Sequence, residues 1–373
     1  MKKTLIALAL TALPVAAMAD VVLYGQIKGG VGVTGGAGVT STSIDRVSVS
    51  GDSTTTHLKS NDKSGTITQM EDYGSRIGFK GEEDSGNGLK AIWQVEQRVS
   101  LAGAGASEGF NTRDTFIGLE GGFGKVRAGY VSDQFNENME TMDIWEYRTG
   151  AGAAARGLAT MTRFDGRSQG VRYDSPNFGG FDFNITHQLS DSATEGRFDK
   201  PGNDDMGQST IVGLNYENSG FFGKVGYGVY ETAGDDEGQL VRVEGGYDAN
   251  NLFVGLAYQY AKDMPAYDAY GNGSIGGIAD KAHEAAVSVA YTMGAVTPKI
   301  TYAHGWDQKI NGSDVDASGY DQVIIGADYA LSKRTTALVS AGWMNSANSI
   351  NTQTGELEDG DLYSVGVGLR HKF

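Results

Sequence analysis

The chain has 373 residues, a formal net charge of −16 and no cysteine. The charge argues against a nucleic-acid partner, which needs a basic surface, and the lack of cysteine excludes disulfides and thiolate metal sites. The chain also contains 56 glycines but only 5 prolines. Because proline interrupts the hydrogen-bond ladders of sheets and glycine relieves crowding in them, this imbalance indicates many strands rather than disorder.

Residues 1–19 are predicted to be a secretory signal peptide. Lys2 and Lys3 precede an apolar run that ends at Ala17-Met18-Ala19, a small-x-small cleavage site. A membrane anchor is the alternative, but the run is shorter than the roughly 20 apolar residues that a spanning helix needs. The mature chain would therefore begin at Asp20.

Beyond the signal peptide, apolar and polar residues alternate strictly in about sixteen segments of the ~10-residue length that is typical of membrane-barrel strands. In chain order the clearest are "VRVEGGY", "LFVGLAYQY", "EAAVSVAY", "DQVIIGADY" and "TALVSAGW". The connections are alternately short and long. The short ones are "EEDSGNG", "GG" at Gly121, "SPNFGG", "ENSG", "DANN", "MGA" and "LSK"; the long ones are residues 34–73, 101–109, 131–167, 190–208, 232–238, 262–280, 307–319 and 345–360.

The alternation of short turns and long loops predicts the topology of the barrel. In an up-and-down barrel every second connection lies on the same rim, so seven short turns and eight long loops imply sixteen strands with both termini on the short-turn side. A barrel of that size leaves an aqueous channel. We therefore predict an all-β fold, a transmembrane antiparallel up-and-down barrel of sixteen strands.

Aromatic residues support a lipid-facing wall. Tyr216, Tyr247, Tyr291 and Tyr329 each close a strand just before a short turn, on the parity of the aliphatic residues. The final segment, residues 362–373, alternates in the same way, and we expect the ring of Phe373 in the same girdle. A soluble β-sandwich also buries one face of each strand, but the loop rhythm and the girdle favour the barrel.

The opposite parity should face water. Its basic members are Lys28, Arg76, Lys80, Lys90, Arg98, Lys125 and Arg127. A lumen packed with apolar side chains would not show this pattern, whereas inward polar residues are typical of a hydrated pore. These seven residues are therefore candidate pore-wall cations.

Several segments resemble the Gram-negative porins of betaproteobacteria, most closely the neisserial major porins. The resembling stretches are "ALPVAAMADVVLYGQIKGGV", "GSRIGFKGEEDSGNGLKAIWQVEQ", "NTRDTFIGLEGGFGKVRAGY", "VRYDSPNFGGFDFNI", "VTPKITYAHG", "YDQVIIGADYALSKRTTALVSAGW" and "VGVGLRHKF". The resemblance implies that residues 20–373 form one general-porin barrel in the outer membrane, among lipid and lipopolysaccharide. It also implies a homotrimer that passes small hydrophilic solutes and ions without a cofactor, and a terminal Phe373 that signals to the barrel-assembly machinery.

The resemblance further implies that the third long loop, residues 131–167, folds inward as a constriction. Its acidic residues are Asp133, Glu137, Glu140, Asp143 and Glu146, and Arg148, Arg156, Arg163 and Arg167 follow them. Opposed charges across a narrow aqueous gap produce a transverse field that filters ions by sign. We predict loop carboxylates opposite the wall cations, although each single charge has the alternative of a solvated rim position.

Selectivity is harder to predict from these charges. The net charge of −16 favours cations at the mouth, while the basic wall favours anions within, and we expect slight cation selectivity. One departure from the family pattern bears on this point. Relatives commonly carry arginine where Tyr130 stands here, so one basic group expected near the constriction is missing.

Other classes of function have less support. The histidines, His57, His187, His283, His304 and His371, show no pairing with a serine that would indicate a hydrolase, so we expect no enzymatic activity. The acidic stretches "PGNDD" and "GDDEG" lack the spacing of a calcium-binding loop, so we expect no metal site. The alternative function is an adhesin or host-interaction barrel with little transport role, which the long loops permit.

Overall fold

The computed structural model describes residues 21–36, 66–101, 110–145, 161, 164, 166–189, 206–232, 237–267, 274–315, 318–350 and 357–373. Several sequence predictions lie outside these residues: the signal peptide (1–19), the first mature residue Asp20, His57, Glu146, Arg148, Arg156, Arg163, "PGNDD" and most of "GDDEG". Large parts of the predicted long loops, residues 146–160 of the third loop among them, also lie outside the described residues.

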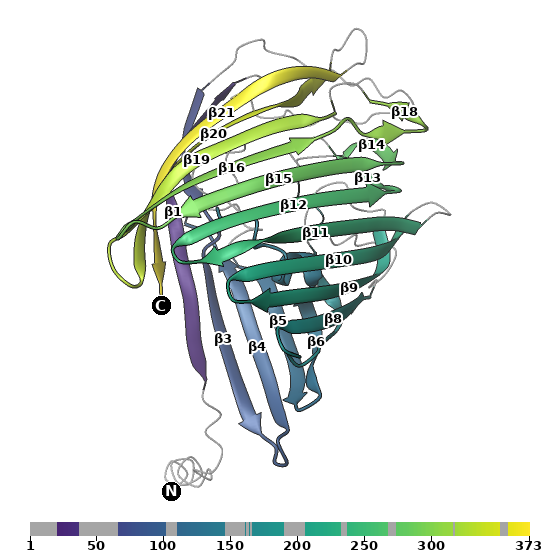
Figure 1. The fold of residues 1–373 in the computed structure, drawn as a ribbon, viewed down its shortest axis with the longest axis vertical. Helices are drawn as coiled ribbons and strands as arrows, with labels where there is room; N and C mark the ends of the chain where they lie inside the picture. The colour runs from purple at the N-terminus through teal and green to yellow at the C-terminus, as the bar shows by residue number, and fades with distance from the viewer. Residues whose placement is uncertain are drawn as a thin grey trace, which may run out of the picture.

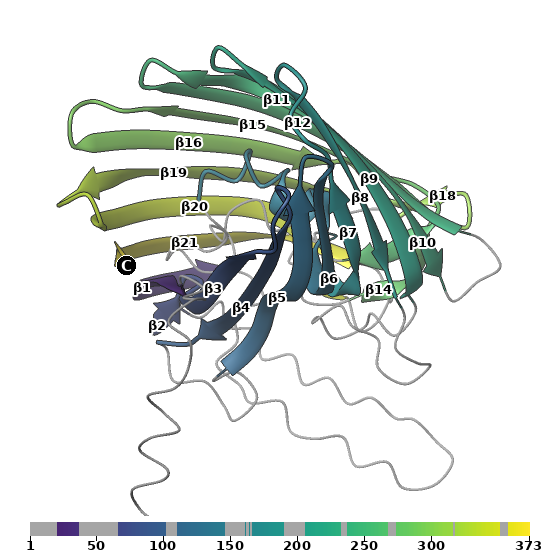
Figure 2. The same cartoon turned by 90° about the horizontal axis from the view of Figure 1, so that it is seen from below.

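The described residues form a single antiparallel sheet that curves into a closed barrel (Figures 1 and 2). Its strands are β1 (Val22–Gly36), β2 (Thr66–Asp72), β3 (Arg76–Asp84), β4 (Lys90–Val99), β5 (Phe110–Gly121), β6 (Gly124–Ser132), β7 (Arg167–Asp174), β8 (Phe181–Gln188), β9 (Met206–Asn218), β10 (Phe221–Thr232), β11 (Glu237–Ala249), β12 (Leu252–Lys262), β15 (Ala282–Tyr291), β16 (Val296–Gly305), β19 (Tyr320–Ala330), β20 (Thr335–Ile350) and β21 (Leu357–Lys372). From β3 onward each strand in this series pairs with the next, β2 and β3 both pair with β1, and β21 pairs with β1 to close the sheet.

The strand count agrees with the prediction. β2 and β3 pair with successive parts of β1, so together they occupy one position in a 16-strand barrel. Two small hairpins, β13 (Met264–Tyr267) with β14 (Ser274–Ala279) and β17 (Lys309–Ile310) with β18 (Ser313–Asp314), lie in long loops. Within the described residues, no helix is both long and apolar enough to cross a membrane.

All seven predicted short turns join paired neighbouring strands, but some long loops are shorter than predicted. β2 lies inside the predicted loop 34–73, and β20 and β21 extend to Ile350 and back from Leu357, inside the predicted loop 345–360. Outside the hydrocarbon layer the outer face of a strand need not be apolar. The backbone pairing of these strands therefore extends beyond the residues in which apolar and polar side chains alternate.

The two faces of the wall have the predicted character. On β21, Val365 and Leu369 are 51% and 53% exposed, whereas Leu362 and Ser364 are 3% and 1% exposed. At the short-turn rim, Tyr216 lies 4.4 Å from Phe181 and Tyr247 lies 5.0 Å from Phe221, centroid to centroid. These outward rings, with exposed Tyr291, Tyr329 and Phe373, form the predicted girdle.

A bulge separates β2 from β3 opposite Lys28. The Ser75 hydroxyl accepts the Lys28 N–H (2.9 Å) and donates to the Lys28 carbonyl (3.1 Å), replacing a ladder partner. The Asp72 carboxylate accepts the N–H groups of Gly74 (2.9 Å) and Ser75 (3.1 Å), which fixes the bend. Bulges of this kind re-aim side chains, and this one turns Tyr73 into the interior, where it is 1% exposed.

The C-terminal residue closes the barrel seam. Phe373 and Gly25 of β1 exchange both backbone hydrogen bonds, each 3.1 Å long. A Cβ at Gly25 would lie 2.8 Å from Cζ of Phe373, so the ring occupies the space that the missing side chain leaves. Phe373 therefore has a structural partner at the seam, and its role as an assembly signal stays a prediction.

Replacing Gly25 with alanine is expected to weaken this seam. The added methyl overpacks the site against Phe373 and the Arg76 carbonyl, and overpacking typically costs about 1–3 kcal/mol. The measurement is the temperature at which the folded barrel loses its compact mobility in SDS gels. Gly223→Ala is the control, because nothing lies within 4 Å of a Cβ there. Equal temperatures for the two variants would show that the ring does not need this space.

Candidate functional site

The chain enters the barrel after β6 through a short helix, α2 (Gln134–Glu137). Asp133 is its N-cap: the carboxylate accepts the N–H of Asn136 (2.9 Å) and that of Gly166 (3.1 Å). Asp133 is fully buried. It therefore holds the two ends of the loop together and does not face the lumen, contrary to the prediction.

Amide side chains fix α2 to β8 and β9. Gln134 donates to Asn215 Oδ1 at 2.8 Å, and Asn184 donates to Gln134 Oε1 at 2.5 Å. The Gln134 side chain also fills the space where Gly213 has no Cβ. Since all of these side chains point inward, α2 lies against the inner wall.

Two wall arginines bind the end of α2. Glu137 Oε2 lies 2.9 Å from Arg127 Nη2 and 3.3 Å from Arg172 Nη1. Arg172 also donates to the Ser132 carbonyl (3.0 Å) and to Asn138 Oδ1 (2.6 Å). Asp174 completes the cluster at 2.8 Å from Arg127 and 2.7 Å from Arg172. Arg127 thus faces inward, in direct contact with two carboxylates.

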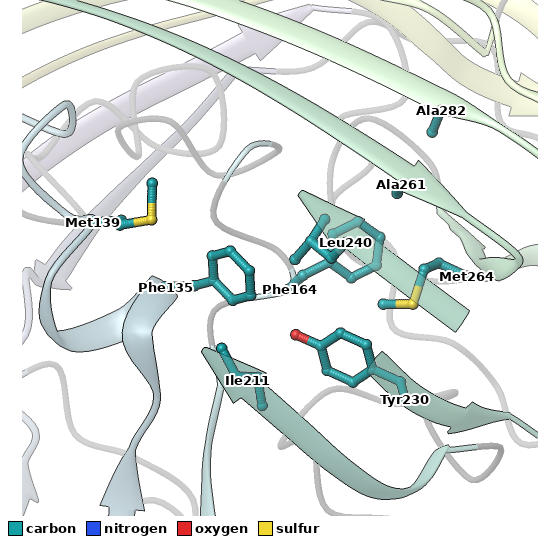
Figure 3. Close-up of a cluster of buried hydrophobic side chains, with 9 residues drawn as sticks. All are labelled: Phe135, Met139, Phe164, Ile211, Tyr230, Leu240, Ala261, Met264 and Ala282. Carbon is teal, nitrogen blue, oxygen red and sulfur yellow. The ribbon is translucent and has the colours of Figure 1, made fainter. Parts of the chain in front are cut away.

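Apolar side chains carry the loop along the wall. Figure 3 shows Phe135 pointing from α2 into a buried cluster, which consists of Phe135, Met139, Phe164, Ile211, Tyr230, Leu240, Ala261, Met264 and Ala282. Next along the loop, Met142 packs in a second cluster that includes Ala257, Ala286 and Ala303 of β12, β15 and β16. The small wall residues leave room for the loop, so this part of the barrel interior is a packed core.

The end of the described segment is bound through its carbonyl groups. Ser288 donates to the Met142 carbonyl (2.8 Å), Lys299 to the Ile144 carbonyl (3.1 Å) and Lys28 to the Trp145 carbonyl (3.3 Å). The Trp145 indole donates to Thr301 Oγ1 at 2.9 Å. Lys28 is 1% exposed, so this predicted pore-wall cation is a loop anchor.

Residues 134–145 therefore follow the inner wall from β8 to β16 and reach β1. Asp143, also predicted to face the wall cations, is 5% exposed and accepts the Trp145 N–H at 3.1 Å. Glu137 stays exposed and Glu140 partly exposed. These two are the described loop carboxylates that remain available to the lumen.

An arginine cluster lies on the wall of β3 to β5. Arg76 and Arg98 are opposite each other in register, and Arg76 lies 3.8 Å from Glu96. Arg113 forms an ion pair with the same Glu96. Arg76, Arg98 and Arg113 are all partly exposed, so the cluster carries an excess of positive charge over its one carboxylate.

Sequence parity missed Arg113 for an identifiable reason. The register of β4 with β5 shifts between Val95 and Gln97. This bulge brings two successive residues of β5, Arg113 and Asp114, opposite Glu96, and both bond inward, Asp114 to Arg167 at 3.0 Å. A simple alternation from Ile117 would place Arg113 outside.

The remaining predicted cations lie toward the short-turn rim. Lys80 lies 5.4 Å above the Tyr24 ring, and Lys90 pairs with Glu82 at 2.7 Å. Lys125 is in register with Glu120 and Asp174 at the start of β6. Of the predicted cations, Lys28 and Arg127 thus contact the loop, whereas Arg76 and Arg98 lie on the wall of β3 and β4.

A closed barrel with an apolar outer face, charged inner walls and a loop packed inside defines a membrane channel. The Gram-negative porin family model matches residues 44–373, and the chain belongs to this family of outer-membrane channels. The "Major outer membrane protein P.IB" of Neisseria sicca is 42% identical over 100% of both chains, and that of Neisseria gonorrhoeae 37% identical over 100% of both. The chain is a general diffusion porin of the outer membrane.

Solved structures show the same fold at lower identity. The anion-selective porin from Comamonas acidovorans has a TM-score of 0.68 at 22% identity and covers 95% of this chain and 100% of its own. Salmonella typhi OmpF, in complex with daunomycin, has a TM-score of 0.66 at 20% identity, covering 95% and 98%. These likenesses concern the barrel alone.

Proposed function

We propose that solutes pass between the third loop, residues 131–167, and the wall of β3 to β5, and that this gap is the constriction. The observation that supports it is the path of residues 134–145, which are bonded to wall strands from β8 round to β1. That side of the interior is filled by packed side chains. In this proposal, water and ions pass along the opposite side of the interior, next to the wall of β3 to β5.

Charge selection arises from the groups on the two sides of this gap. Glu137 and Glu140 lie on the loop side, and Arg76, Arg98 and Arg113 lie on the wall side. Low-dielectric walls concentrate the field between them. We propose slight cation selectivity, in which Glu137, Glu140 and the net charge of −16 outweigh the wall arginines, whose positive charge Glu96 offsets only in part.

Neutralising the two loop carboxylates tests this proposal. A unit charge about 7 Å from a passing ion in water changes its energy by about 0.6 kcal/mol. Because a cation gains this energy and an anion loses it, the E137Q/E140Q variant should lower the cation-to-anion permeability ratio, by up to about sevenfold for each carboxylate before salt screening, in salt-gradient measurements across planar bilayers. Glu83→Gln, an exposed carboxylate at the short-turn rim, is the control. An unchanged ratio in the double variant removes this loop from the filter.

Assembly as a homotrimer is part of the same proposal and rests on family membership. Conductance that rises in steps of three after single insertions supports a trimeric channel. An adhesin or host-interaction platform, the alternative function, predicts silence in the same recording. Cleavage after residue 19, recognition of Phe373 by the assembly machinery and contact with lipopolysaccharide are likewise proposed.

A further inference from the structure

Basic residues gather at one corner of the short-turn rim. The turn between β19 and β20, residues 331–334, reads Leu-Ser-Lys-Arg, and the last strand ends beside it with Arg-His-Lys-Phe. The Lys372 N–H donates to the Arg334 carbonyl at 2.9 Å, so the two segments are neighbours. In a protein of net charge −16, this corner is locally positive.

No other short turn resembles it. The six remaining short turns, residues 85–89, 122–123, 175–180, 219–220, 250–251 and 292–295, contain no charged residue. At the strand ends that adjoin these turns, charges of both signs occur together, as at Glu82 and Lys90 on either side of the β3–β4 turn, which pair at 2.7 Å. Figure 1 shows that turn far from the C-terminus. Among the seven short turns, all of which the structure describes, residues 331–334 are therefore the one turn that itself carries positive charge.

The corner is held in a fixed conformation. Ser332 Oγ accepts the N–H groups of Arg334 (3.2 Å) and Thr335 (3.0 Å), and Leu331 donates to the Thr335 carbonyl at 3.0 Å. Thr335 Oγ1 lies 2.9 Å from Nδ1 of His371 on the last strand. Because the backbone is ordered, little conformational entropy is lost when a ligand binds.

The cationic side chains are available. Lys333, Arg334 and Lys372 are exposed. Among the residues that the structure describes, none forms an ion pair with these three, and the Asp328 carboxylate on the same hairpin is occupied by Lys299 at 2.8 Å. The nearest fixed negative charge in sequence is the terminal carboxylate of Phe373. The corner therefore has a net positive charge without a side-chain counter-ion.

Apolar groups adjoin these cations on the membrane side. Leu331 and Tyr329 are 56% and 49% exposed, and Phe373 is 38% exposed. Short turns of outer-membrane barrels lie on the periplasmic side. The order is thus a lipid-facing apolar wall, then aromatic rings, then cations, which matches the order of acyl chain, interface and headgroup in the inner leaflet.

We propose that Lys333, Arg334 and Lys372 bind the headgroup of an anionic phospholipid of the periplasmic leaflet. The headgroup phosphate contacts the cations while the acyl chains lie on Leu331 and the neighbouring wall. Charge complementarity selects the anionic headgroup, and continuity with the apolar wall selects a lipid over a soluble anion. The attraction between one basic group and anionic lipid at a membrane surface, counted for two such groups, corresponds to a preference for the anionic over the neutral lipid of about 30-fold.

Native mass spectrometry of the detergent-solubilised full-length protein tests the proposal. Phosphatidylglycerol and phosphatidylcholine with identical acyl chains are added in equal amounts, and retained lipid is counted. The wild type should retain phosphatidylglycerol preferentially, and K333Q/R334Q should lose most of that preference. Unchanged channel conductance of the variant confirms that it is folded.

Lys90→Gln is the matched control, because Lys90 is a partly exposed cation on the same rim that already pairs with Glu82 at 2.7 Å. It should leave the preference intact. The proposal is overturned if the wild type shows no preference, if the double variant keeps it, or if Lys90→Gln reduces it equally. Competition by glycerol phosphate or by polyglutamate at the same concentration as the lipid would also overturn it, in favour of a free phosphate or an acidic protein partner.

Discussion

The Arg172→Leu variant is expected to lose about 3–5 kcal/mol of unfolding free energy, the usual cost of removing one partner from a buried ion pair. Arg172 is fully buried and bonds to Asp174, Glu137, the Ser132 carbonyl and Asn138. Leucine fills much of the volume but satisfies none of these acceptors. Glu137 and Asp174 then lose part of the positive charge that balances their negative charges, and the start of the third loop loses one of its wall contacts.

Urea unfolding in lipid vesicles, followed by tryptophan fluorescence, measures this loss. Arg98→Leu is the control, because Arg98 also faces inward, opposite Arg76, but is partly exposed to the lumen. It should cost less than about 1 kcal/mol. Arg172→Lys keeps the charge and not the forked geometry, so its loss should be intermediate. If the two leucine variants are equally stable, the buried cluster contributes nothing to the fold.

The barrel could be predicted from the sequence because its evidence is local and repeated. Alternation along each strand sets which residues face lipid, and the seven short turns set the strand count. Neither depends on contacts between distant residues. Phe373, for example, was placed in the girdle by its parity on the last strand, and its exposed ring lies at that rim.

The constriction was less predictable, since it depends on contacts that alternation does not report. Lys28 and Trp145 are 117 positions apart in the sequence, yet their contact makes Lys28 an anchor rather than a pore cation. Nothing in the neighbourhood of Asp133 shows that its carboxylate will cap a helix and also bind Gly166. Lys28 and Asp133, two charged residues predicted to face the lumen, thus bind backbone groups of the third loop instead.

Bulges explain the other failures. The shift between Val95 and Gln97 turns Arg113 and Asp114 to the same side, which a strict period of two cannot represent. The bend at residues 73–75 hides β2 within what the sequence presents as one long loop. In the sequence the two irregularities correspond to the adjacent charged residues Arg113 and Asp114 and to the Gly74-Ser75 pair between β2 and β3, and neither pattern by itself predicts a bulge.

The Trp145 side chain anchors the end of the described loop segment in addition to the carbonyl contacts, and the Trp145→Ala variant is expected to release this end. Trp145 is 1% exposed, its indole donates to Thr301, and Lys299 Nζ lies 4.7 Å from the ring centroid. Truncating a buried tryptophan typically costs about 3–5 kcal/mol. The barrel ladder does not include Trp145, so we expect this cost to weaken the attachment of the loop more than the stability of the barrel.

Single-channel recording detects this release. A loop tip that leaves the wall moves into the aqueous path, so the Trp145→Ala channel should show rapid current flicker and closures at voltages where the wild type is quiet. Trp343→Ala is the matched control: its indole is 40% exposed on the outer face and bonds to Asp361 at 3.1 Å. That variant should conduct as the wild type does. Quiet, full-sized openings in Trp145→Ala would mean that Ser288, Lys299 and Lys28 hold the carbonyl groups of residues 142–145 without help from the ring.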